Sequence, residues 1–291
     1  MPEGPEVTFM VGRLNHILAD KYITSIQFHP SSRYGKKTPD NFASLVGKFP
    51  LRVLRVANKG KFIYFHLEGD IIIFQTLGMA GGWYTKEHKN LAFTLTYSNS
   101  ASSDTTTKNN LYMVDPRHFA TLKIFLTDGI KQLEKKLASL GPDLVQFFSR
   151  TKISSTENDA FYNDFHRIMR KNNSKNICVV LMEQKNFSGI GNYLKSEILD
   201  DAAIHPLCTV SQLDDIKLEI LYASMKKIIT ASIKANGTKI SSYSDMLMPP
   251  EDAIYDFEVY QRKTAKNGDK ILKITTPDKR TTFYREITLS C

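Results

Sequence analysis

The chain opens with a helical repeat of apolar positions. After Pro5 these positions recur every three or four residues: Val7, Met10, Val11, Leu14, Ile17 and Leu18. This spacing predicts one amphipathic helix from Pro5 to about Ala19. Proline suits the first turn, where its missing N–H would have no intrahelical partner.

The pattern then changes to short runs rich in β-branched and aromatic residues, separated by Gly, Pro, Asp and Asn. Seven such runs are predicted strands: Tyr22–Phe28, Leu51–Val56, Lys61–Leu67, Ile71–Leu77, Ala92–Tyr97, Leu111–Val114 and Thr121–Leu126. Many short strands at this spacing are typical of a sandwich or barrel. We expect a short helix at Asp40–Val46 and a mobile surface loop at the polar Ser98–Asn110.

Helical periodicity dominates after Leu126. The predicted helices are Gly129–Leu140, Asn158–Arg170, Asn176–Glu183, Tyr193–Asp200 and Ser211–Lys234. The breaker Gly141-Pro142-Asp143 indicates a linker. Strand patterns return near the end, at Phe257–Arg262, Lys270–Thr275 and Thr281–Ile287, and predict a β-hairpin.

These patterns predict an α+β protein of two domains. The first, residues 1–127, has an amino-terminal helix and a β-sandwich. A linker region at 128–150 precedes a helical domain at 151–256, and residues 257–291 form the hairpin. The 291 residues, 42% of them hydrophobic, suffice for two cores.

Composition narrows the functional classes. The net charge of +9 suggests a polyanionic partner, although a merely basic soluble protein has the same balance. No apolar run approaches the roughly 20 residues of a membrane span. Cys178, Cys208 and Cys291 are far apart and odd in number, so we expect neither a disulfide framework nor a metal site. A soluble, intracellular protein in a reducing compartment is expected.

The first residues, Met1-Pro2-Glu3, have reactive potential. If Met1 is removed, Pro2 has a free secondary amine, which loses its proton more readily than a lysine and can act as a nucleophile. Its attack on a sugar C1′ would form an iminium and acidify the C2′ proton. Glu3 could supply the acid or base for this chemistry. The alternative is an inert polar start.

Glu6 lies one helical turn beyond Pro2. Its carboxylate either faces the same pocket or is a first-turn acid favoured by the helix dipole. Both interpretations remain open.

Three loops in the first domain hold further candidates. The turn at 58–61 ends in Lys61, either part of a basic turn or a phosphate ligand. Met79 lies on a glycine-bounded loop, and Arg117 and Phe119 lie on another. Met79 and Phe119 are either core residues or an exposed apolar wedge.

The second domain contains the segment Gly189-Ile190-Gly191-Asn192 between two predicted helices. A Gly-x-Gly turn that enters a helix exposes N–H groups to an anion, and the helix dipole adds to the attraction. Asn192 can cap that helix or donate its amide to a phosphate. Such turns also occur in bundles without a ligand.

Four motifs of this chain resemble motifs of the formamidopyrimidine-DNA glycosylase/endonuclease VIII family and occur in the same order. They are the amino terminus, Asp115–Phe119, the Gly-Ile-Gly-Asn turn and Lys279–Tyr284. The resemblance covers residues 2 to about 285. It implies a monomeric, cofactor-free, bifunctional DNA glycosylase and AP lyase, with damaged DNA in a basic cleft between its domains.

The resemblance also implies roles for the candidate residues. Pro2 would be the nucleophile and Glu3 the acid, supported by Lys61 and Glu6. Lys61 would also bind phosphate, together with Asn192 and Arg280. The base to be excised must be flipped out of the duplex, and an apolar wedge with an arginine can fill the hole. The matching residues are Met79, Arg117 and Phe119.

In most of the family the tail is a zinc finger with two Cys-x-x-Cys pairs. Thr264–Asn267 and Tyr284–Ile287 occupy these places and contain neither Cys nor His, so they cannot hold a structural zinc. The chain resembles the zincless-finger variants of the endonuclease VIII-like branch. Lys279 replaces the glycine at the tip, which puts the tip geometry in question.

Different features of the sequence favour two different classes of lesion. A zincless finger implies oxidised pyrimidines and hydantoin lesions. Asn236–Lys239 and Ala253–Lys263 resemble the branch that prefers 8-oxoguanine and formamidopyrimidines, but Ser244–Ile254, which would cover 8-oxoguanine, is short. Oxidised pyrimidines are therefore favoured. A non-catalytic damaged-DNA binder and a ribosomal-type nucleic-acid module are the alternatives from other classes.

Overall fold

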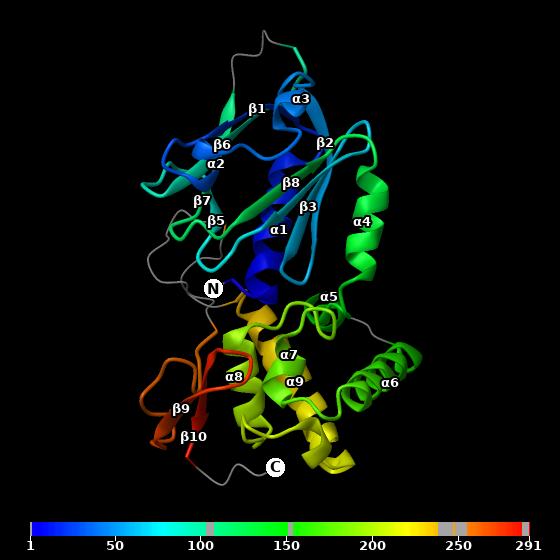
Figure 1. The fold of residues 1–291 in the computed structure, drawn as a ribbon, viewed down its shortest axis with the longest axis vertical. Helices are drawn as coiled ribbons and strands as arrows, with labels where there is room; N and C mark the ends of the chain where they lie inside the picture. Colours follow the sequence, from blue (N-terminus) through cyan, green and yellow to red (C-terminus); the bar gives the residue numbers. More distant parts are fainter. Residues whose placement is uncertain (1, 103–107, 151–153, 238–246, 248–254, 287–290) are drawn as a thin grey trace. The chain divides into compact units, whose positions relative to one another are not determined.

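The computed structural model describes residues 2–102, 108–150, 154–237, 247, 255–286 and 291, which divide into two compact units (Figure 1). The first unit holds Pro2, residues 6–139 and Leu247. The second holds Glu3–Pro5, residues 140–237 and 255–286, and Cys291. The sequence places a boundary at 127, whereas the first unit continues to Ser139.

The first unit is built on one eight-stranded antiparallel sheet, with the strand order β5-β7-β6-β1-β2-β3-β4-β8. The strands are β1 (Tyr22–Phe28), β2 (Leu51–Lys59), β3 (Phe62–Leu67), β4 (Ile71–Thr76), β5 (Gly82–Tyr84), β6 (Leu91–Ser98), β7 (Asn109–Val114) and β8 (Thr121–Phe125). All seven expected strands are present. The sequence missed β5, which is too short to show an alternating pattern.

Helix α1 (Gly4–Leu18) fills the middle of this unit (Figure 1). Its residues Met10, Leu14 and Leu18 are completely buried in the same apolar cluster as the inward side chains of the sheet. The predicted apolar stripe is therefore confirmed as the core face of the helix. The described residues of this unit also form the helices α2 (Arg33–Lys36), α3 (Phe42–Val46) and α4 (Gly129–Ala138).

The second unit is mainly helical. Its helices are α5 (Leu144–Phe148), α6 (Ser155–Lys171), α7 (Ile177–Met182), α8 (Asn192–Asp201), the 3-10 helix η1 (Val210–Gln212) and α9 (Asp215–Lys234). The strands β9 (Ile271–Thr275) and β10 (Thr281–Arg285) form an antiparallel hairpin beside α8 (Figure 1). The sequence missed α5, which Asp143 caps by accepting two backbone N–H bonds.

Two element predictions in this unit are corrected. The helix expected at Ser211–Lys234 is divided, because Asp214 caps a new helix after η1. Phe257–Arg262 forms no strand. The Glu197 carboxylate accepts the N–H groups of residues 258, 259 and 260 at 2.9, 3.0 and 2.8 Å, so these donors are not available to a strand ladder.

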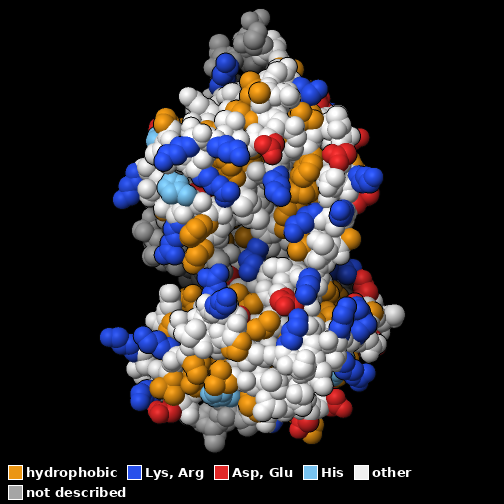
Figure 2. All heavy atoms as spheres, in the orientation of Figure 1, with side chains coloured by type: hydrophobic (Ala, Val, Ile, Leu, Met, Phe, Trp, Pro, Cys, Tyr) orange, Lys and Arg blue, Asp and Glu red, His pale blue; other side chains and the backbone are white. Residues whose placement is uncertain are grey.

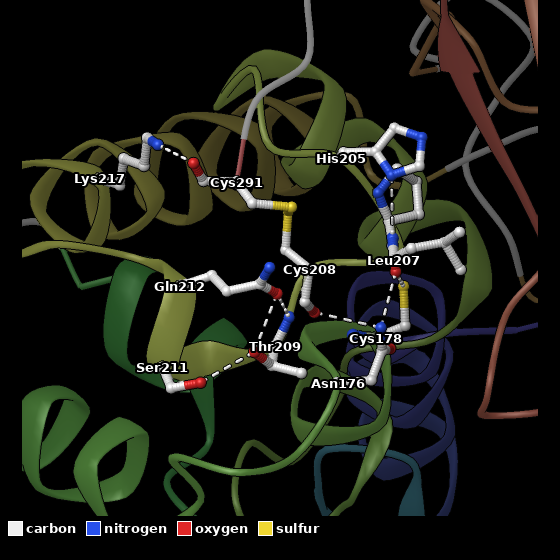
Figure 3. Close-up of a disulfide and its surroundings, with 11 residues drawn as sticks. Asn176, Cys178, His205, Leu207, Cys208, Thr209, Ser211, Gln212, Lys217 and Cys291 are labelled. Atoms are coloured by element: carbon white, nitrogen blue, oxygen red, sulfur yellow. Dashed lines mark hydrogen bonds between the residues drawn. A yellow bond between two sulfur atoms is a disulfide. The ribbon is translucent and has the colours of Figure 1, made fainter.

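The expectation that no cysteines pair is wrong. Cys208 and Cys291 form a disulfide with a Cα–Cα distance of 5.3 Å, although they are 83 positions apart in the sequence (Figure 3). The Lys217 ammonium also donates to the Cys291 carbonyl oxygen (Figure 3). Sequence spacing contains no information on this proximity, because helix α9 and the hairpin lie between the two cysteines. Cys178 is a buried free thiol.

None of the helices in the described part of the chain is long and apolar enough to span a membrane.

Candidate active site

The Glu3 side chain is held at the amino terminus of α8. Its carboxylate accepts the N–H groups of Gly191 at 2.8 Å, Tyr193 at 2.8 Å and Leu194 at 3.2 Å, and the side chain is 1% exposed. These N–H groups have no partner inside the helix, and the positive end of the helix dipole lies among them. The site therefore suits a carboxylate and holds it in one place.

Two glycines allow this close approach. A Cβ on Gly191 would lie 2.2 Å from Glu3 Cδ, and a Cβ on Gly4 would lie 2.6 Å from Val145 Cγ2 and 3.0 Å from Gly189 Cα. The Gly4 N–H also donates to the Gly189 carbonyl at 2.8 Å. The start of the chain is thus packed backbone against backbone on the Gly-x-Gly turn.

Pro2 and Glu6 flank this anchored segment. Pro2 is buried, and it directly precedes the fixed Glu3. Glu6 lies in the first turn of α1 with a completely buried side chain. A carboxylate at such a depth requires polar partners.

Lys61 lies immediately before β3, as expected, and is half-buried. Its turn is tightly built: Gly60 has a φ of +56°, and the Asn58 amide donates to the Gly60 carbonyl at 2.9 Å and to the Thr8 hydroxyl at 3.0 Å. The Thr8 contact fixes the turn to α1. The backbone of Lys61 is therefore held in one position relative to α1.

The three candidate wedge residues lie on two adjoining loops. An Arg117 guanidinium nitrogen lies 3.9 Å from Met79 Sδ. A Cβ on Gly78, which has a φ of +63°, would lie 2.8 Å from the Phe119 carbonyl carbon, so the two loop backbones touch. Phe119 is 56% exposed and Met79 is half-buried. Phe119 is not a core residue.

The hairpin presents Arg280 on an exposed turn. The Lys279 N–H donates to the Thr276 carbonyl at 2.8 Å, and Lys279 has a φ of +62°. Lys279 thus adopts the left-handed conformation that this type of turn usually gives to glycine. At the base of β10, the Asn192 side-chain amide donates to the Thr281 carbonyl at 2.8 Å.

Tyr260 joins this group, and the sequence analysis missed it. Burial raises the pKa of the Tyr260 phenol, and a hydrogen bond with the Asn192 side chain lowers it; the Glu3 carboxylate raises this pKa further, and the Arg280 charge lowers it. The phenol is therefore within electrostatic reach of both charged groups. Its ring packs against Phe283 and Phe257, with centroids 5.3 and 5.1 Å apart. Because Tyr260 lies in a segment predicted as a strand, the sequence did not indicate that its phenol lies near these residues.

The hairpin does not provide the ligands of a structural zinc. Thr264–Asn267 and the described part of Tyr284–Ile287 have no thiolate or imidazole. In the described ranges, no three His, Cys, Asp or Glu side chains come together as a metal site. The donor set does not fit the metal.

The candidate residues fall into two groups. Pro2, Glu6, Lys61 and the three wedge residues belong to the first unit, and Glu3, Asn192 and Arg280 belong to the second. Lys and Arg are the prevalent charged side chains on the face shown in Figure 2. This distribution agrees with the excess of basic residues.

Comparison with known proteins identifies both halves of the chain. The family model "Formamidopyrimidine-DNA glycosylase N-terminal domain" matches residues 1–122, and "Formamidopyrimidine-DNA glycosylase H2TH domain" matches residues 154–244. The formamidopyrimidine-DNA glycosylase of Bacillus subtilis is 29% identical over 254 residues, 84% of this chain and 82% of that protein. The enzyme of Ureaplasma parvum is 28% identical over 250 residues, with the same shares.

Solved structures show the same fold. A Lactococcus lactis Fpg mutant, crystallised with a Fapy-dG containing DNA, has a TM-score of 0.78 at 22% identity and covers 100% of both chains. The MutM (Fpg) protein of Thermus thermophilus has a TM-score of 0.73 at 22% identity, over 97% of each chain. At this identity the similarity establishes the fold.

The fold and the two matched domains define the class of protein, which is a DNA glycosylase with a helix–two-turn–helix domain. The two domain matches are consecutive and account for most of the chain. The chain belongs to the formamidopyrimidine-DNA glycosylase/endonuclease VIII family. It is a DNA glycosylase with AP lyase activity and acts in base excision repair.

Proposed function

We propose that this chain excises oxidised bases through a Schiff base on Pro2 and then cuts the strand by β- and δ-elimination. One observation supports this most strongly: Glu3, which follows Pro2 directly, has its carboxylate fixed by three N–H groups at the start of α8. An acid–base group held in one geometry next to a nucleophile is the arrangement that such chemistry requires.

The proposed steps begin once Met1 has been removed. The Pro2 nitrogen forms a bond to C1′, and the glycosidic C1′–N bond breaks as the base departs, taking a proton from solvent water. Glu3 accepts the proton of the Pro2 amine and delivers it to the ring oxygen O4′ as the C1′–O4′ bond opens. The resulting iminium acidifies C2′. Loss of the C2′ proton expels the 3′ phosphate in the β-elimination, and the δ-elimination that follows expels the 5′ phosphate.

Damaged DNA is the proposed partner, bound by a monomer of this protein. Lys61, Asn192 and Arg280 bind phosphates around the flipped nucleotide. Arg280 is exposed on a defined turn, and Lys61 lies at a turn that is fixed to α1. Contacts to phosphate position a strand without reading its sequence, which suits an enzyme that must act anywhere in DNA.

Met79, Arg117 and Phe119 are proposed to fill the void that the flipped nucleotide leaves. The exposure of Phe119 and its short distance from the Met79 loop support this role, because a wedge must be available to the duplex. Arg117 is exposed beside Met79 and can donate to the orphaned base.

Two lesion classes are candidates. The absence of cysteine and histidine at the finger positions favours oxidised pyrimidines and hydantoins. The short segment 244–254 also favours them in the sequence, but it lies outside the described residues except for Leu247. The names of the curated relatives favour formamidopyrimidines instead. Duplexes with one lesion each, scored for cleavage, separate the two classes.

The catalytic proposal is tested with Glu3→Gln, compared with Glu87→Gln, an exposed acid in the first unit. Loss of acid–base catalysis is expected to slow single-turnover excision by about 10²–10⁴-fold. DNA affinity stays within a few-fold, because Glu3 is 1% exposed. Wild-type excision by the Glu3 variant would contradict the proposal. If the wild-type protein binds damaged DNA and never cuts it, a non-catalytic binder or a ribosomal-type module is favoured.

A further inference from the structure

Helix α8 presents a row of polar side chains to the hairpin. Asn192 donates to the Thr281 carbonyl at 2.8 Å, and the Ser196 hydroxyl accepts the Phe283 N–H at 3.3 Å. One turn further, the Asp200 carboxylate accepts the Arg285 N–H at 2.9 Å and its guanidinium at 2.9 and 2.8 Å.

The spacing of this row follows from backbone geometry. Residues 192, 196 and 200 are four apart and share one face of the helix, and residues 281, 283 and 285 share one side of the strand. Eight residues of helix rise about 12 Å, and four residues of strand rise about 13 Å. The two elements therefore stay in register over the whole length of β10.

A buried ion pair occupies the end of this row that is nearest to Arg280. The Lys195 ammonium lies 2.6 Å from Asp278 Oδ2, and the two side chains are 0% and 5% exposed. Asp278 Oδ1 lies 2.5 Å from the Thr276 hydroxyl and 3.3 Å from the Arg280 nitrogen, whose N–H it accepts. The Thr276 hydroxyl is also 2.8 Å from that of Thr282.

This pair is more than a stabilising contact. A buried ion pair is often no better for stability than apolar residues of the same volume, and its best-attested role is to specify one arrangement. Here Asp278 links the helix to both sides of the turn, while the Arg280 side chain stays exposed. The turn also includes Lys279 in a left-handed conformation, which an L residue adopts only when its surroundings hold it there.

We propose that Lys195 and Asp278 are positioning residues that fix the hairpin turn on α8 and so orient Arg280 towards a DNA phosphate. The proposal rests on the phosphate-binding role proposed above for Arg280. The effect of the ion pair on the turn itself can be measured without DNA. Without the pair, the turn loses its single arrangement, and Arg280 loses the pre-organisation that makes its phosphate contact effective.

The test uses a neutral pair, Lys195→Met with Asp278→Asn, which leaves no unpaired buried charge. The matched control, Lys266→Met with Glu258→Gln, removes an exposed pair of 2.9 Å near the hairpin. Binding to a duplex with one tetrahydrofuran abasic analogue is measured with and without Arg280→Ala.

In the wild-type background, Arg280→Ala is expected to weaken binding about tenfold or more and to lower the salt slope of log Kd by about one. The neutral pair is expected to do the same, and Arg280→Ala then adds less than about twofold. The neutral-pair variant is expected to excise at close to the wild-type rate when DNA is saturating, because the pair acts on binding alone. If Arg280→Ala keeps its full effect in the neutral-pair background, the proposal is wrong.

Hydrogen exchange distinguishes this failure from a failure of the DNA-binding role. The neutral pair is expected to accelerate exchange of the Lys279 and Thr276 amides, which bond across the turn, and to leave the α8 amides protected. Unchanged exchange at the turn overturns the positioning proposal, whatever Arg280 does with DNA. If the neutral pair does not fold, Thr276→Val leaves the ion pair intact and is expected to give a smaller acceleration in the same amides.

Discussion

Replacing Gly191 by alanine tests the Glu3 anchor directly. The added Cβ would lie 2.2 Å from Cδ, 2.4 Å from Oε1 and 2.6 Å from Cγ of Glu3. Gly191 has an extended backbone, with φ −129° and ψ −158°, which alanine adopts without strain. The substitution therefore acts on the carboxylate alone, which must move by about 1 Å or more to reach ordinary contact distances.

The cost can be worked from the lost contacts. Each of the three N–H bonds to the carboxylate contributes about 1.5–3 kcal/mol, as for hydrogen bonds to charged groups. Loss of two of them costs on the order of 3–6 kcal/mol, and the lower entropy of the unfolded alanine chain returns up to about 1 kcal/mol. A catalytic group displaced by about 1 Å also slows the reaction about 10²-fold.

The assay is single-turnover cleavage of a duplex with one lesion, together with the thermal midpoint of each variant. Gly12→Ala is the control, since it lies on the exposed face of α1 with no atom within 4 Å of the added Cβ. We expect Gly191→Ala to cut the duplex at least about 100-fold more slowly than the wild type and Gly12→Ala to cut it at the wild-type rate. Wild-type cleavage by Gly191→Ala would refute the view that the α8 terminus holds Glu3 in its working position.

Three further predictions concern single residues. Phe119→Ala should leave the free energy of unfolding within about 0.5 kcal/mol of wild type, like the control Leu54→Ala, another exposed apolar side chain of the first unit, yet slow excision on duplex DNA; equal excision by the two variants would exclude the wedge. Burial raises the pKa of the Cys178 thiol to about 11 from its ordinary value near 9, so its stabilising contribution is present below pH 9 and is lost towards pH 11. A thiol reagent at pH 8 should label Cys178 only after unfolding, and rapid labelling of the native protein would contradict its burial. Lys279→Gly should leave the thermal midpoint at or slightly above the wild-type value, because relief of about 1–2 kcal/mol of left-handed strain offsets the up to about 1 kcal/mol that the more flexible unfolded glycine chain costs; a fall of more than that entropy cost alone would show that the turn is not strained.

The elements that the sequence could predict are those that a local pattern determines. Apolar residues at helical spacing mark α1 because the helix buries one face, and alternating runs mark most of the sheet for the same reason. Phe257–Arg262 has the composition of a strand and forms none, because the distant Glu197 takes its N–H groups. Such competition by a single buried side chain leaves no periodic signal.

The candidate site divides in the same way. Pro2, Glu3 and the Gly-x-Gly turn are evident as motifs, but a motif does not reveal that Glu3 accepts the N–H of Gly191, 188 residues further along the chain. Lys195 looks in the sequence like a solvated helix lysine and is completely buried, because its partner Asp278 arrives from the hairpin. Pairings of this kind depend on the tertiary fold alone.

Covalent trapping tests the central claim most directly. The protein is incubated with lesion-containing duplex and sodium borohydride, and the adduct is mapped by mass spectrometry after digestion. We expect one DNA adduct on the nitrogen of Pro2, and none when an extra glycine precedes Pro2 and keeps that nitrogen in a peptide bond. Strand cleavage at the wild-type rate by the extended protein, or an adduct on a lysine, would contradict the account.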